Sequence, residues 1–336
     1  MPAVGGEGLE KIEDMIVRAA ESTAAHVRAA KAAIGTVIFG QDKVVEQALV
    51  TILSGGHALL LGVPGLAKTK LVDTMGTVIG LDARRIQFTP DLMPSDILGT
   101  EVLEESQTGK RSFRFISGPV FAQLLMADEI NRASPRTQSA LLQAMQEQHV
   151  TVAGTRHDLP KPFHVLATQN PLEQEGTYPL PEAQLDRFLM EIDVGYPDRE
   201  AERRILFETT GSEETRPKPA MTAEDLMAAQ RLVRRLPVGD SVVEAILALV
   251  RSARPGADSS GDASLIAWGP SPRASQALML AVRARALLDG RLAPSIDDVA
   301  ELAEPILKHR MALTFTARAE GETIEGVIGR LKARIG

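Results

Sequence analysis

The chain has 336 residues, 44% hydrophobic and 24% charged, which indicates an ordinary globular protein of about two domains. Its lack of cysteine excludes disulfides, thiolate catalysis and cysteine metal sites, while a net charge of -7 and 4% aromatic residues disfavour nucleic acid as the main ligand. No run reaches the roughly 20 apolar residues of a membrane helix and the N-terminus carries no secretory pattern, so we expect a cytoplasmic protein without a membrane span.

The first predicted element is an amphipathic N-terminal helix within residues 1–35, where apolar residues recur three and four positions apart. Residues 36–198 alternate short apolar runs with helical patterns. Strands are predicted at 57–63, 84–88, 121–128, 163–168 and 188–194, and helices at 42–53, 68–80 and 135–148. Continuous apolar strands interleaved with helices are typical of a parallel sheet covered on both faces, so we predict an α/β core of αβα layers.

Two insertions interrupt this core. Residues 99–118 and 148–162 alternate apolar and polar side chains around turn-forming residues, so each is predicted to form a β-hairpin. The first turn is expected at 107–110. Three basic residues near this tip, Lys110, Arg111 and Arg114, either contact a client or nucleic acid or simply lie in solvent, and the solvated interpretation is favoured.

Residues 199–336 are predicted to form a smaller, all-helical domain. Four helices are expected to begin after residues that favour helix N-termini. These residues are Thr222, Ser241, Ser271 and Ser295. Residues 253–269, rich in Pro, Gly and Ser, are predicted to form a loop between two of these helices.

A phosphate-binding loop is predicted where the first strand runs through 62–70, G-V-P-G-L-A-K-T-K, into a helix. Small residues let successive backbone N–H groups point at phosphate oxygens, while Lys68 supplies charge and the Thr69 hydroxyl reaches Mg²⁺. Ala67 stands where the strict pattern has glycine, so its backbone must adopt a conformation open to a Cβ. The alternative is a tight turn with a solvated lysine.

Two acids, Asp128 and Glu129, end the apolar strand predicted at 121–128. We expect this strand beside that of the phosphate loop, so that Asp128 binds Mg²⁺ and Glu129 orients and deprotonates the attacking water. Asn170 follows the next strand and is expected to fix that water from the opposite side. Without the other motifs, the acids would indicate only a solvated strand end and Asn170 only a cap.

Two arginines are candidates for neutralising charge on the γ-phosphate. Arg187 lies just before the last predicted strand and Arg273 opens a helix of the second domain. Taken singly, each is more often a surface salt-bridge partner.

In this order the motifs resemble the MoxR family of AAA+ ATPases, over about residues 35–335. The matching segments are 37–41, the GVPGLAKT loop, 91–99, 127–133, ATQNP at 167–171, 184–188 and SPRAS at 271–275. The resemblance implies a P-loop NTPase (AAA+) core followed by a helical lid. It also implies assembly into a homo-oligomeric, hexameric ring with ATP bound between subunits. It assigns the phosphate loop to Walker A, Asp128 and Glu129 to Walker B, and Asn170 to sensor 1.

The remaining assignments also come from the resemblance. Arg187 becomes the arginine finger, with Arg132 and Arg136 as alternatives, and Arg273 becomes sensor 2, acting on its own or on a neighbouring nucleotide. Thr69 and Asp128 are the expected Mg²⁺ ligands. The expected ATP-binding set is Gly40, Gln41, Pro64, Gly65, Leu66, Ala67, Lys68, Thr69 and Lys70.

The function implied is a Mg²⁺-dependent ATPase that acts as a chaperone on client proteins, one candidate partner being a von Willebrand factor A domain protein. Three alternatives stay open at this point. The ATPase subunit of a metal chelatase shares this architecture. A DNA-translocating motor would need a basic channel, which the acidic balance disfavours, and a non-hydrolysing nucleotide switch would lack an acid such as Glu129.

Overall fold

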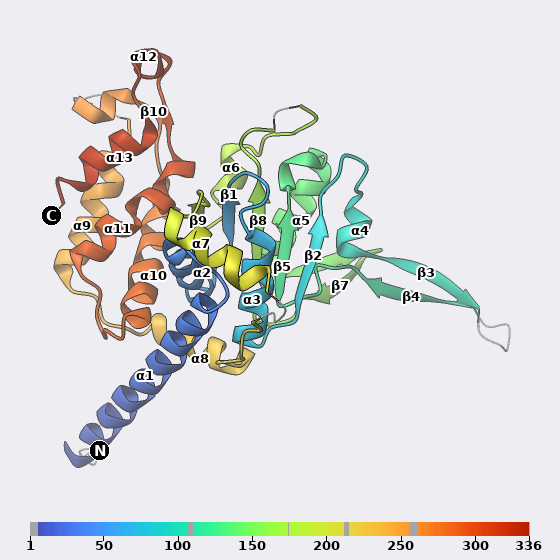
Figure 1. Ribbon diagram of the computed structural model, residues 1–336, viewed down its shortest axis with the longest axis horizontal. Helices are drawn as coiled ribbons and strands as arrows, with labels where there is room; N and C mark the ends of the chain where they lie inside the picture. Colours follow the sequence, from blue (N-terminus) through green and yellow to red (C-terminus); the bar gives the residue numbers. More distant parts are fainter. Residues whose placement is uncertain (1–5, 106–110, 174, 212–214, 256–260, 336) are drawn as a thin grey trace.

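The computed structural model describes residues 6–105, 111–173, 175–211, 215–255 and 261–335 (Figure 1). Its centre is a five-stranded, wholly parallel sheet of order β2-β5-β8-β1-β9. The strands are β1 (Ala58–Leu61), β2 (Ala83–Gln87), β5 (Leu124–Asp128), β8 (His164–Gln169) and β9 (Met190–Asp193). All five predicted strands are therefore confirmed.

Helices cover both faces of this sheet. Three of them lie where the sequence predicts: α2 (Asp42–Leu53), α3 (Lys68–Ile79) and α5 (Pro135–Glu147). Alternate strand residues enter two different cores, so that Leu60 packs with α2 and α3 while Leu59 packs with α5. Because side chains alternate across a strand, an apolar run buried on both faces requires two helical layers. The αβα core is confirmed.

Both predicted hairpins are present. The first pairs β3 (Gly99–Glu105) with β4 (Arg111–Ser117), and the second pairs β6 (His149–Val152) with β7 (Thr155–Asp158). The β3–β4 hairpin extends away from the core (Figure 1). Its predicted turn, which includes Lys110, lies outside the described residues. Short helices α4 (Pro94–Leu98) and α6 (Glu182–Leu185) and the 3₁₀ turn η1 (Ile130–Arg132) complete the core connections.

The region after residue 198 is mainly helical, as predicted. It contains α7 (Arg199–Thr209), α8 (Ala223–Val233), α9 (Asp240–Ser252), α10 (Pro272–Leu288), α11 (Ile296–Leu307), α12 (Phe315–Ala319) and α13 (Ile324–Lys332), with the 3₁₀ turns η2 (Gly261–Leu265) and η3 (Lys308–Arg310).

Two details of this lid differ from the prediction. The lid is not entirely helical, because β10 (Ile266–Trp268) pairs with β11 (Ala312–Leu313) in an antiparallel ribbon. That pairing satisfies backbone groups of a segment predicted as loop, of which 256–260 lie outside the described residues. Helix α9 begins at Asp240, after Gly239, rather than after Ser241. The helices predicted after Thr222, Ser271 and Ser295 begin where expected.

The N-terminal helix α1 (Gly6–Gly35) projects from the body of the molecule, and its C-terminal part packs against that body (Figure 1). Ala24, Val27, Ala30 and Ile34 are buried there, at the spacing of one helical face. They contact the core formed by α2, α3 and the lid helices. Within the described ranges, no helix combines the length and apolar character needed to cross a membrane.

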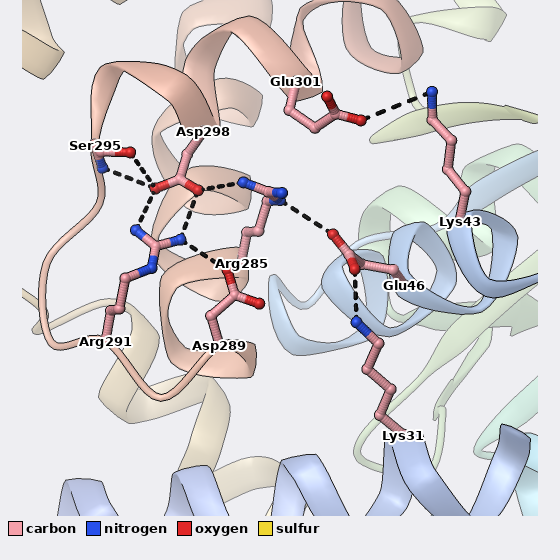
Figure 2. A network of polar contacts seen from close by, with 9 residues as sticks. All are labelled: Lys31, Lys43, Glu46, Arg285, Asp289, Arg291, Ser295, Asp298 and Glu301. Atoms are coloured by element: carbon pink, nitrogen blue, oxygen red, sulfur yellow. Dashed lines mark hydrogen bonds and ion pairs between the residues drawn. The ribbon is translucent and has the colours of Figure 1, made fainter.

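A polar network joins the lid to α1 and α2 (Figure 2). Asp298 of α11, whose side chain is fully buried, accepts hydrogen bonds from Arg285 at 2.6 Å and from Arg291 at 2.7 Å. Arg285 also donates to Glu46 of α2 at 3.1 Å, and Lys31 of α1 donates to the second oxygen of Glu46 at 2.6 Å. The lid is thus attached to the core by paired charges as well as by apolar packing.

Replacing Asp298 by asparagine is expected to lower the free energy of unfolding by about 2–3 kcal/mol at pH 7. The loss should fall below the roughly 3–5 kcal/mol of a fully buried pair because Arg291 is partly exposed. Urea denaturation measures it, with Asp297→Asn, an exposed neighbour in the same helical turn, as the control. Equal stability of the two variants would contradict a structural role for the network.

The free energy of unfolding lost in Asp298→Asn should depend on pH. Burial raises the pKa of Asp298, but hydrogen bonds from Arg291, the Ser295 backbone and Arg285 outweigh it and leave that pKa below its ordinary value. A carboxylate with a lowered folded-state pKa stabilises the fold above its unfolded pKa, and this contribution disappears as the pH falls through the folded value. The stability difference between wild type and Asp298→Asn should therefore shrink below about pH 4.

Candidate functional site

The predicted phosphate loop connects β1 to α3. Ala67 adopts φ 56° and ψ 21°, so the residue in place of glycine takes a left-handed conformation, at a cost of roughly 1 kcal/mol for a side chain with a Cβ. The Lys68 ammonium donates to the carbonyl oxygens of Gly62 and, at 3.2 Å, of Val63. Burial lowers the pKa of Lys68, although two nearby carboxylates oppose the shift. In this conformation the Lys68 ammonium is therefore hydrogen-bonded to carbonyl oxygens of its own loop.

The two acids at the end of β5 reach the same edge of the sheet as the phosphate loop. They do not lie on a strand adjacent to β1, as the sequence suggested, because β8 lies between β1 and β5. All these strands are parallel, so their carboxyl ends still meet at one edge. The insertion of β8 places Asn170 between the loop and the acids.

Hydrogen bonds hold both acids. Asp128 Oδ1 accepts from the Thr168 hydroxyl at 2.5 Å, and Oδ2 accepts from the Arg85 guanidinium, also at 2.5 Å. Glu129 has a left-handed backbone, with φ 55°, and its N–H donates to the same Thr168 hydroxyl at 2.8 Å. Its carboxylate accepts from the Gln87 amide at 2.7 Å. A strained backbone at an acidic strand end is typical of a functional site.

Sequence reasoning missed Arg85, Gln87 and Thr168. A signal was present in β2, where Arg85 and Gln87 stand two positions apart near the strand's carboxyl end and therefore share one face. Thr168 carried no such signal because it resembles any β-branched strand residue. Only the order of the strands reveals that all three face the acids.

These groups surround a cavity of about 510 Å³. Its lining residues are Pro64, Gly65, Leu66, Ala67, Lys68, Thr69, Lys70, Arg85, Gln87, Asp128, Glu129 and Asn170. Asn170 is 9% exposed and its Oδ1 accepts from the Leu172 N–H at 3.1 Å. Backbone N–H groups at a helix start, two lysines and two acids give this cavity the composition of a phosphate site.

A second, apolar cavity of about 120 Å³ shares the phosphate-loop residues Gly65, Leu66, Ala67 and Lys70. The other lining residues include Val37, Ile38, Phe39, Gln41, Pro197 and Ile205. Gly40, with φ +69°, does not line this cavity. It allows the chain to lie close to Ala201, because a Cβ at position 40 would lie 2.4 Å from the Ala201 Cβ. An apolar cavity joined to a phosphate cavity has the composition of a site for a nucleoside with its phosphates.

The residues expected to hold Mg²⁺ fit that ion. Thr69 and Asp128 line the same cavity and offer hydroxyl and carboxylate oxygens, which Mg²⁺ prefers. Among the residues that the structure describes, no three acidic or histidine side chains cluster as a metal site. An ion here would therefore take its other ligands from water and phosphate oxygens, as Mg²⁺ commonly does.

The two candidate arginines lie elsewhere. Neither Arg187 nor Arg273 is among the described residues that line the phosphate cavity. They line a separate cavity of about 240 Å³ together with His57, Met145, Gln146, Asp186 and Gln276. Arg187 donates to the Leu142 carbonyl at 2.7 Å. The structure therefore brings these two arginines to each other and away from the phosphate loop of the same chain.

The alternative finger residues behave differently. Arg132 does not line the phosphate cavity, but it lies 3.3 Å from the Glu129 carboxylate and 3.6 Å from that of Glu173. Arg136 is exposed in the first turn of α5. Arg132 is therefore held beside an acid of its own chain, whereas Arg136 lies at the surface of α5.

Comparison with known proteins gives a consistent result. Residues 57–190 match the ATPase family associated with various cellular activities (AAA), and residues 260–330 match the AAA lid domain. The chain is 43% identical over 332 residues to "Chaperone MoxR1" of Mycobacterium tuberculosis, covering 97% of this chain and 87% of that protein. It is 31% identical over 309 residues to "Protein MoxR" of Paracoccus denitrificans, covering 86% and 89%.

A solved structure has the same fold. It is the crystal structure of a putative ATPase from Cytophaga hutchinsonii, which superposes with a TM-score of 0.88 at 37% sequence identity. The match covers 98% of this chain and 99% of that one, so it includes the core and the lid together.

Proposed function

Because the chain belongs to the MoxR family of AAA+ ATPases, we propose that its ATPase activity depends on Mg²⁺, takes place in a homo-oligomeric ring, and remodels client proteins. The observation that carries this proposal is the convergence of Lys68, Asp128, Glu129 and Asn170 on one cavity of about 510 Å³. A strand order that gathers a cation, two acids and an amide provides the groups that phosphoryl transfer to water requires.

Each residue has a distinct role in the proposed reaction. Lys68 leaves the loop carbonyls and neutralises the β- and γ-phosphates. Thr69 and Asp128 would hold Mg²⁺, which would spread phosphate charge when bound. Glu129 accepts a proton from the attacking water, and Asn170 orients that water. Gln87 donates to Glu129 Oε2 at 2.7 Å, so Oε1 is the oxygen that accepts the proton in the proposed step.

The position of the arginines supports a ring. A hydrolytic site needs positive charge opposite the phosphate loop, and Arg187 and Arg273 lie away from that loop in their own chain. A neighbouring subunit related by cyclic symmetry would present the same two arginines to the nucleotide. We therefore propose that both arginines act in trans in a hexamer. For Arg273 this is one of the two alternatives that the resemblance leaves open, the other being action on its own nucleotide.

Replacing Glu129 by glutamine is expected to reduce ATP turnover by about 10²-fold or more while ATP binding persists, because the amide keeps the shape of the side chain and cannot accept the proton. Steady-state hydrolysis and a direct binding titration measure the two effects. Glu301→Gln, an exposed carboxylate of α11, is the matched control. Turnover that survives in Glu129→Gln would remove Glu129 as the base.

The same variant tests the client proposal. Since Glu129→Gln should retain ATP, rings loaded with ATP should hold their clients, and affinity capture followed by mass spectrometry identifies them. The name of the Mycobacterium tuberculosis relative supports a chaperone role, and a von Willebrand factor A domain protein is the partner that we propose. Recovery of chelatase subunits instead would favour that rival function.

A further inference from the structure

A residue of the lid holds the turn that carries Arg187. Arg310, in η3, is only 2% exposed. Its Nε donates to Asp186 Oδ1 at 2.7 Å, while Nη2 donates to the Phe188 carbonyl at 2.6 Å and Nη1 to the Leu189 carbonyl at 3.1 Å. One guanidinium therefore binds acceptors on both sides of Arg187 in the chain. A planar fork with several fixed donors suits such a multiple contact better than lysine does.

The Asp186 carboxylate extends this arrangement to Arg273. Its Oδ2 lies 3.7 Å from Arg273 Nη1 and accepts from the Ser271 hydroxyl at 3.3 Å. Both partners stand at the start of α10, whereas Arg310 follows α11. Asp186 thus connects the finger turn to two separate parts of the lid, and its side chain is only 13% exposed.

The cavity that Arg187 and Arg273 line has an excess of positive charge. Among the described residues that line the cavity of about 240 Å³, Asp186 is the one acid. The buried Arg310 neutralises the charge of Asp186. The same lining offers no second carboxylate to neutralise Arg187 and Arg273. His57 adds no charge, because burial and the neighbouring His164 lower its pKa to about 3. The cavity therefore presents two arginines to an incoming anion.

We propose that Asp186 and Arg310 are positioning residues, which hold Arg187 and Arg273 together in the orientation that meets the phosphates of a neighbouring subunit's nucleotide. This inference rests on the proposed action of those arginines in trans. Displacing a transition-state group by about 1 Å can cost on the order of 10²-fold in rate. The lid thereby contributes to hydrolysis at a site that lies across the subunit boundary.

The test compares ATP turnover and ATP affinity in wild type, Asp186→Asn, Arg187→Ala and the double variant. Asp186→Asn is expected to lower turnover about 10-fold or more and to leave the dissociation constant for ATP within about 2-fold, since it changes no residue of the phosphate cavity. The double variant should be no slower than Arg187→Ala, because a misplaced finger and an absent finger fail in the same step. Glu182→Gln, an exposed acid of α6, is the control.

Several outcomes would overturn the inference. Wild-type turnover in Asp186→Asn would do so, as would a double variant in which the two losses multiply. If Arg187→Ala itself keeps full turnover, the assignment of the finger fails and this inference fails with it; if Arg187→Ala is slow and Asp186→Asn is not, only the inference fails. Arg310→Lys, which keeps the charge and loses the fork, provides the same comparison should Asp186→Asn not fold.

Discussion

Replacing Arg187 by alanine is expected to lower ATP turnover of the assembled ring by about 10³-fold or more, the scale measured for arginine fingers in other phosphoryl-transfer systems. The physical reason is the loss of a cation that meets charge developing on the γ-phosphate of the adjacent subunit. ATP affinity should change little, because Arg187 does not line the phosphate cavity of its own chain. Arg318→Ala, an exposed arginine at the end of α12, is the matched control.

Mixing separates action in trans from a structural role. Arg187→Ala subunits and Lys68→Ala subunits should each be inactive alone, but a mixed ring contains some boundaries at which an intact phosphate loop faces an intact finger. Turnover should therefore return when the two are mixed under conditions of subunit exchange. Rings shown by native mass spectrometry to be mixed, yet still inactive, would exclude Arg187 as the finger and leave Arg132 and Arg136 as the candidates.

Replacing Lys68 by alanine is expected to abolish measurable ATP binding. Lys68 is the cation that the phosphate loop places at its helix start, and burial in the cavity strengthens its interaction with phosphate oxygens relative to that in water. The variant should be folded, because the ammonium now contacts only carbonyl oxygens of Gly62 and Val63 among the hydrogen bonds of the described structure. Titration with a fluorescent ATP analogue measures the affinity.

The control for this variant is Lys43→Ala, since Lys43 is an exposed lysine of α2 with one distant ion-pair partner. Its ATP affinity should equal that of wild type. Unchanged affinity in Lys68→Ala would mean that the loop does not bind phosphate. A lowered melting temperature accompanying the lost affinity would instead point to a folding defect.

Local patterns in the sequence were sufficient for much of the fold. The five core strands and their helices could be predicted because short, mostly apolar runs and amphipathic helices depend on residues close together in the chain. The ribbon of β10 and β11 could not, since its partners are separated by the whole of α10 and α11 and each strand has at most three residues.

The residues of the site could also be predicted from short segments of the sequence. Residues 62–70 and the acids Asp128 and Glu129 each end a strand, so their types and positions indicate phosphate and Mg²⁺ without any knowledge of the strand order. The order itself was misjudged, with β8 rather than β5 adjacent to β1. Parallel strands bring their carboxyl ends to one edge whatever their order, so this error did not displace the site.

The positions of the charged residues and of the turns follow from the sequence alone, but the contacts between these residues depend on the tertiary structure. Arg85 contacts Asp128 because β2 pairs with β5, and Arg310 contacts Asp186 across 124 positions because η3 of the lid packs on the turn before β9. Contacts of this kind depend on the packing of entire elements, whose free energy is shared among many residues, and so no local pattern in the chain reports them.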